Sequence, residues 1–81
     1  MFNIVKKFVD EFNPMGLLPR APDNEYDNES KKIVCQINQN STIYEIAEII
    51  SKVLSKSFDE KIEIKKCLAT AEKIYQSLNH N

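Results

Sequence analysis

The fold class is decided by residues 42–57, which read TIYEIAEIISKVLSKS. The apolar residues of this stretch recur every three to four positions, a spacing that places them on one face of an α-helix. They are Ile43, Ile46, Ala47, Ile50, Val53 and Leu54, with Ile49 widening the face. Thr42 is followed three residues later by Glu45, which is the capping-box pattern of a helix start. We therefore predict a helix over about 42–57, and we expect it to be the most buried of the chain.

The segments on both sides of this helix show the same spacing. Residues 2–12 and 63–78 each carry an amphipathic helical pattern. Residues 23–38 carry a further one, with Asp23 expected as its N-cap. No run of the sequence alternates apolar and polar residues, so no strand is predicted. We therefore expect an all-α fold with about four helices in a compact bundle whose packing is orthogonal or irregular.

Length and composition limit the class of protein. The chain has 81 residues, of which 42% are hydrophobic and 28% charged, and its formal net charge is −1. A chain of this length forms one core, so we expect a single domain over residues 1–81. The hydrophobic content excludes a disordered chain, and the balanced charge argues against a general nucleic-acid binder. No apolar run of about 18 residues is available to span a membrane, so neither nucleic acid nor a membrane is expected as a partner.

The N-terminus and the cysteines predict a cytoplasmic protein. Lys6 and Lys7 interrupt the apolar residues where a secretory signal needs an unbroken run of about seven. Cys35 and Cys67 are too few for the disulfide framework that secreted domains of this size carry, so we expect both thiols to be reduced. The chain holds 10 Ile, 10 Lys and 8 Asn but a single Arg, a bias that suggests an AT-rich bacterial genome.

No constellation for catalysis is found in the sequence. The single histidine, His80, lies next to the C-terminus, where order is least expected. Neither cysteine has a base near it in the sequence, and a cysteine on an apolar helix face is usually inert. The single Gly excludes a glycine-rich phosphate loop. We therefore predict a protein that is not an enzyme and has no cofactor.

A run of alternating acidic residues is the strongest candidate for a metal site. A calcium loop that begins at Asp23 needs Gly and a carboxylate at positions that hold Asn28 and Val34 instead. The acidic residues are Asp23, Glu25, Asp27 and Glu29. On a helix they fan around the axis instead of converging, and negative charge near a helix start favours the helix dipole. We therefore expect no metal.

Residues 13–29 have an unusual organisation. They read NPMGLLPRAPDNEYDNE and hold all three prolines, the single Gly and the single Arg. Asn13, Pro14 and Gly16 have the spacing of a type I turn, and the later prolines make residues 13–22 a stiff connector.

Two interpretations of this connector are open. In one, Arg20 pairs with Glu25 or Glu29 and ties the connector down, while Leu17 and Leu18 cap the core. In the other, the connector and the following helix start form a rigid contact patch for another protein, because tyrosine and arginine favour such patches and stiff loops lose less entropy on binding. The residues of this patch are Leu17, Leu18, Arg20, Glu25, Tyr26 and Glu29.

The same residues carry a family resemblance. The segment resembles the signature D/N-P-x-G-L…A-P-x-x-E-Y-D-x-E of small proteins from Bacillus-type Firmicutes that share the label domain of unknown function 1871. The resemblance covers the whole chain, with Phe12 and Asn13 where many members have Trp-Asp. It implies an all-α intracellular protein and supplies no activity.

Three hypotheses for function follow. The leading one is a non-enzymatic, cytosolic protein-interaction or regulatory module that uses residues 13–22 and the start of the second helix to bind a protein partner. The alternative is a self-associating structural protein, such as a homodimer, because the apolar face of residues 42–57 is wide. The third is a binder of a small ligand or metal at the acidic start of the second helix.

Overall fold

The computed structural model of the chain describes residues 1–16 and 25–79. These residues form four α-helices and, within the described ranges, no strand. The helices are α1 (Phe2–Phe12), α2 (Asp27–Val34), α3 (Ile43–Phe58) and α4 (Ile64–Leu78). The predicted all-α class with about four helices is therefore confirmed.

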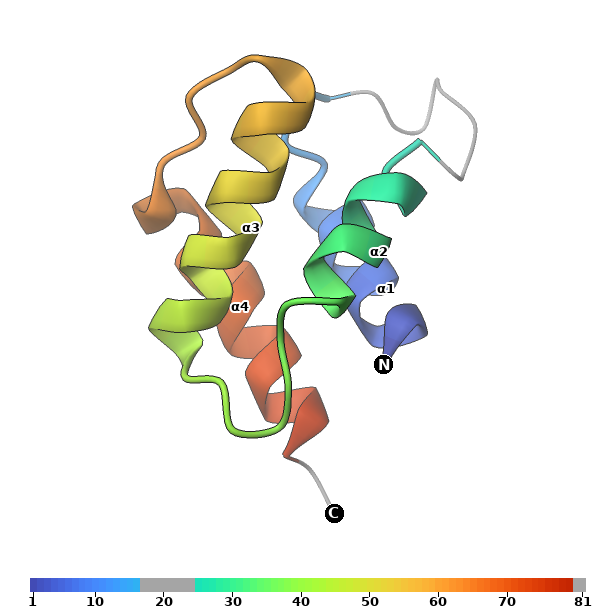
Figure 1. The fold of residues 1–81 in the computed structure, drawn as a ribbon, viewed down its shortest axis with the longest axis vertical. Coiled ribbons are helices and arrows are strands. Elements are labelled where there is room, and N and C mark those ends of the chain that lie inside the picture. Colours follow the sequence, from blue (N-terminus) through green and yellow to red (C-terminus); the bar gives the residue numbers. More distant parts are fainter. Residues whose placement is uncertain (17–24, 80–81) are drawn as a thin grey trace.

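The four helices close into a ring in which each one packs against two others. α1 packs against α2, α2 against α3, α3 against α4, and α4 against α1. Figure 1 shows α3 and α4 side by side on one side of the molecule and α1 and α2 on the other. The ring is uneven, because α2 has 8 residues whereas α3 has 16.

The core lies inside this ring and is centred on α3. This helix buries five residues, namely Ile46, Ala47, Ile50, Val53 and Leu54, more than any other helix. The prediction that it is the most buried helix is confirmed. Each isoleucine or leucine buried in this way contributes about 1.5–3 kcal/mol of hydrophobic free energy. The remaining apolar residues of the predicted face, Ile43 and Ile49, are partly buried and pack against the same core.

The start of α3 confirms the predicted capping box. The Thr42 hydroxyl accepts a hydrogen bond from the Glu45 backbone N–H at 3.1 Å, and the Glu45 carboxylate accepts one from the Thr42 N–H at 2.8 Å. These bonds satisfy two N–H groups that would otherwise have no partner at the helix start. The bounds predicted for α1, α3 and α4 lie within one residue of the observed ones.

The predicted bounds of the second helix were wrong at both ends. The sequence predicts a helix over 23–38, but α2 covers Asp27–Val34 and its N-cap is Tyr26, not Asp23. Tyr26 and Ile37 have helical spacing because both are buried, yet each lies outside the helix. Both residues belong to connecting segments and still pack into the core. The apolar spacing that predicted a longer helix therefore reflects burial and not helical backbone.

No helix in the described part of the chain is long and apolar enough to cross a membrane. Both cysteines are free thiols, as predicted. Cys67 is buried in α4 and Cys35 is exposed just after α2.

Candidate functional site

The candidate site lies where the chain passes from α1 to α2. Asn13 ends α1 in the left-handed conformation, with φ 47°. The Gly16 N–H then donates to the Asn13 carbonyl at 3.0 Å, which closes a tight turn. This confirms the turn predicted at residues 13–16. Leu17, Leu18 and Arg20 of the predicted contact patch, together with Asp23, fall outside the described residues.

Tyr26 fixes the two ends of this connection to each other. Its hydroxyl donates to the Asn13 side-chain carbonyl at 2.8 Å and accepts from the Met15 backbone N–H at 3.2 Å. Its ring is fully buried and meets the edge of the Phe58 ring, with centroids 5.8 Å apart. One side chain thus joins the end of α1, the start of α2 and the end of α3. We call this set of contacts the tyrosine clamp.

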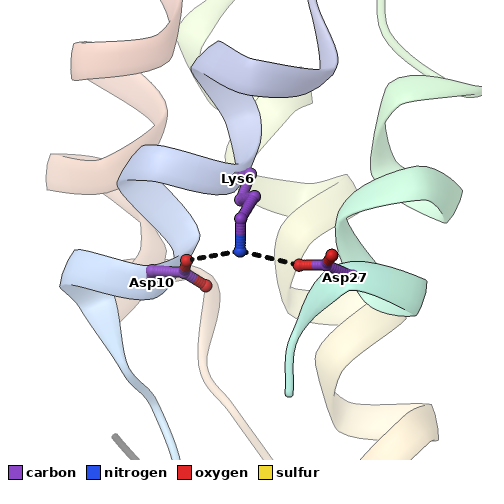
Figure 2. Close-up of polar contacts among 3 residues, drawn as sticks. All are labelled: Lys6, Asp10 and Asp27. Carbon is purple, nitrogen blue, oxygen red and sulfur yellow. Dashed lines mark hydrogen bonds and ion pairs between the residues drawn. The ribbon is translucent and has the colours of Figure 1, made fainter. Parts of the chain in front are cut away.

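A second polar contact ties α1 to the first turn of α2. The Lys6 ammonium lies between Asp10 of α1 and Asp27 of α2, at 2.9 Å and 2.8 Å from their carboxylate oxygens (Figure 2). The hydrogen bond to Asp27, followed by that to Asp10, raises the pKa of Lys6 above its ordinary value of 10.5. Lys6 is therefore a cation throughout the physiological range. The other oxygen of Asp10, Oδ1, is buried and has no hydrogen-bond partner among the described residues.

The structure corrects the expected contact patch at two positions. Tyr26 is fully buried and Glu29 is only 9% exposed, so neither offers a side-chain surface to a partner. Tyr26 is drawn inward because its ring fills the core while its hydroxyl finds two partners at the core's edge. Glu25 is exposed, as a contact residue must be.

The acidic residues at the start of α2 lie in separate surroundings. Glu25 is exposed, Asp27 binds Lys6, and Glu29 is mostly buried. Across residues 1–16 and 25–79, no three residues of the metal-binding types are grouped to hold an ion. The four-residue spacing of Asp27 and Lys31 suggests a pair within the helix, but Asp27 pairs with Lys6 instead.

Sequence reasoning missed Lys6, Asp10 and Asn13 as members of this site. Lys6 and Asp10 are four residues apart on α1, a spacing that is visible in the sequence. Asp27, however, lies 21 positions after Lys6, and no local pattern links the two. Asn13 was identified only as a turn residue, and nothing local shows that its side chain reaches Tyr26.

The buried cysteine of α4, Cys67, is poorly suited to chemistry. Burial raises the pKa of the Cys67 thiol to about 11. The thiolate is the nucleophilic form of cysteine, so Cys67 is protonated and unreactive near neutral pH.

The fold and the site define a small all-α domain whose first two helices are tied together around a proline-containing connection. The chain belongs to the family described as "Domain of unknown function (DUF1871)", whose sequence profile matches residues 4–78. The match confirms that the chain is a member of a domain-of-unknown-function family. No curated protein and no solved structure matches the chain.

Proposed function

We propose that this chain is a protein-interaction module whose contact surface is the connection between α1 and α2. The contact residues are Leu17, Leu18, Arg20 and Glu25. Tyr26, Asn13 and Lys6 act as positioning residues that hold the two ends of this connection in place.

The observation that carries the proposal is the length of a connection whose ends are fixed. Residues 13–26, 14 in all, join α1 to α2, whereas 8 residues (35–42) join α2 to α3 and 5 (59–63) join α3 to α4. Helix–helix connections in bundles usually take about 2–8 residues, and those beyond about 12–15 are usually either functional or linker segments. A connection of this length is not needed to bring α1 against α2.

The fixed ends favour binding for a thermodynamic reason. A segment that is already held at both ends loses less conformational entropy when it contacts a partner. The tyrosine clamp and the Lys6 pairs supply this constraint from outside the contact residues themselves. Arginine is enriched among the residues that dominate the binding energy of protein interfaces, and Arg20 is one of the proposed contact residues.

The surroundings of the thiols and carboxylates support binding over catalysis. The Cys67 thiol has its pKa raised to about 11 by burial. Of the described carboxylates at the start of α2, Glu25 is exposed, Asp27 pairs with Lys6 and Glu29 is mostly buried. The wide apolar face of α3, from which self-association was inferred, packs into the core of a single chain. The protein-interaction function is therefore the one that we retain.

The proposal is tested by capture of a partner from a lysate of the native host. The test variant is Arg20→Ala/Glu25→Lys. The control is Lys65→Ala/Glu72→Lys on α4, which makes the same change in net charge at exposed positions. We expect wild type and control to capture the same protein and the test variant to lose it, while all three melt at similar temperatures.

Two results would count against the proposal. Equal capture by both variants would show that the connection does not contact the partner. Unfolding of the Arg20→Ala/Glu25→Lys variant would show that these residues serve the fold. A second variant, Arg20→Lys, keeps the charge and separates a specific arginine contact from simple attraction.

A further inference from the structure

A groove runs between α2 and α3. Its volume is about 370 Å³. The described residues that line it come from the end of α2, from the connection just after it and from the last two turns of α3. They are Lys32, Gln36, Lys52, Val53, Lys56 and Ser57. Glu25, the contact residue proposed above that the structure describes, is not among them.

The charge in this groove has one sign. Among the residues that the structure describes, three lysines line it and no carboxylate does, although the chain as a whole carries a net charge of −1. In the described ranges, the ion pairs engage Lys6 and Lys73 but none of the three groove lysines. Lys52 and Lys56 are four residues apart on one helix, where like charges repel and destabilise the helix.

A purely structural role explains only part of this arrangement. A lysine in the last turn of a helix offsets the negative end of the helix dipole, which accounts for Lys32 in α2 and Lys56 in α3. Lys52 lies before the last turn of α3, so the dipole does not explain it. Val53 adds an apolar wall to the groove and is itself only 7% exposed.

The geometry points to a binding site for an acidic segment of a partner protein. Lys52 and Lys56 are separated by about 6 Å along α3, and Lys32 faces them from a helix whose axis lies about 8–10 Å away. Positive charges spread in this way match several carboxylates along a peptide better than one compact anion. The Val53 wall accepts an apolar side chain between those carboxylates, and Gln36 and Ser57 add polar contacts at the rim.

The position of the groove argues against a dedicated phosphate site. Phosphate sites in helical proteins commonly use the free N–H groups of a helix N-terminus. This groove lies near the C-terminal ends of both α2 and α3, where the free backbone groups are carbonyls. The lysine ammonium groups are therefore its main donors, and they suit carboxylates that are spaced apart.

The test measures binding of a defined probe to the full chain. The probe is a fluorescein-labelled peptide in which glutamates surround a single leucine, and its counterpart carries glutamine in place of each glutamate. The groove variant is Lys52→Glu/Lys56→Glu. The control variant is Lys65→Glu/Lys66→Glu, which makes the same charge change at exposed positions of α4. Fluorescence anisotropy gives the Kd of each pair.

We expect wild type to bind the acidic peptide but not the glutamine peptide, with an affinity that falls as salt rises. The groove variant should bind at least about tenfold more weakly, and the control should stay within about twofold of wild type. The neutral variant Lys52→Gln/Lys56→Gln should show an intermediate loss, which guards against misfolding caused by charge reversal. The Arg20→Ala/Glu25→Lys variant should bind the peptide as wild type does, because it keeps all three groove lysines.

Three results would overturn the inference. Wild type that fails to bind the acidic peptide at low salt has no such site. Equal weakening in the groove and control variants would mean that the peptide responds only to net charge. Displacement of the peptide by millimolar inorganic phosphate at constant ionic strength would assign the groove to small anions.

Discussion

The connections on either side of the core differ in how they are held. Both begin at a residue in the left-handed conformation, Asn13 with φ 47° after α1 and Asp59 with φ 52° after α3. The α3–α4 connection has 5 residues, and the α1–α2 connection has 14. The short one is closed by hydroxyls of its own preceding helix, whereas the long one is closed by contacts among three helices.

The local bonds of the short connection involve the backbone of Ile62. The Ser51 and Ser55 hydroxyls donate to its carbonyl, and its N–H donates to the Ser55 hydroxyl at 2.9 Å. Ile62 itself is buried in the core. These bonds reverse the direction of the chain within a connection of 5 residues. The long connection is held in addition by a buried tyrosine and by a lysine that lies between two carboxylates.

The largest expected effect comes from removal of the tyrosine that holds the long connection. Tyr26→Ala should lower the free energy of unfolding by about 3–5 kcal/mol, because it empties a fully buried site in the core. Urea denaturation checks this value. The control is Tyr44→Ala, at a side chain that is 57% exposed, and it should change stability by less than about 0.5 kcal/mol. Similar losses at both tyrosines would contradict the clamp.

Tyr26→Phe isolates the hydroxyl of the clamp. The ring and its contact with Phe58 remain, but Met15 loses the acceptor for its N–H and Asn13 loses the donor to its side chain. We expect a loss of about 1–3 kcal/mol, because two partly buried hydrogen bonds are lost and each contributes about 0.5–1.5 kcal/mol. An unchanged urea midpoint would show that the ring alone holds the connection.

The corresponding change in the short connection should have a smaller effect. Ser55→Ala removes the acceptor of the Ile62 N–H, while the Ser51 hydroxyl still binds the Ile62 carbonyl. We expect a loss of about 1 kcal/mol in thermal or urea denaturation. A loss greater than that of Tyr26→Phe would contradict the comparison, because the short connection would then depend more strongly on its hydroxyl contacts than the long one does.

The smallest expected effect on stability comes from Lys6. Its side chain is 29% exposed, and an ion pair that reaches solvent is worth about 0.2–1 kcal/mol. Lys6→Gln should therefore cost that much at neutral pH. The Lys73–Glu11 pair, at 3.7 Å and more exposed, provides the control, and Lys73→Gln should have no measurable effect.

The contribution of Lys6 also has a defined pH dependence. Because its pKa is raised in the folded protein, the stabilisation is fully present below the ordinary lysine pKa of 10.5 and is lost as the pH rises through the folded value. Wild type and Lys6→Gln should therefore differ in melting temperature at pH 8 and converge at strongly alkaline pH. A difference that stays constant across this range would show that Lys6 does not stabilise the fold through its charge.

The helices were predictable because apolar spacing records burial. Ile46, Ile50 and Leu54 follow one face of α3, and the Thr42–Glu45 capping box marks where that helix starts. The same signal failed at Tyr26 and Ile37, because residues in connecting segments can be buried too. The spacing of apolar residues indicates which side chains are buried. It does not show whether the backbone at those residues is helical.

The candidate site was predictable only in its location. The prolines, the glycine and the arginine mark residues 13–29 as unusual, but the contacts that hold this region come from elsewhere. Lys6 reaches Asp27 across 21 positions, and Tyr26 reaches Asn13 across 13. Such bonds depend on how α1 and α2 meet, which no local sequence pattern contains. For the same reason Tyr26 was expected at a surface and lies in the core.

The central claim is that the long connection presents a contact surface instead of completing the core. The free energy of unfolding of Leu17→Asp, measured by urea denaturation against wild type, tests this claim directly. The account predicts a change within about 0.5 kcal/mol, as for other surface substitutions, together with loss of the captured partner. A loss of several kcal/mol, as expected when an unpaired charge is forced into an apolar interior, would place Leu17 in the core and contradict the account.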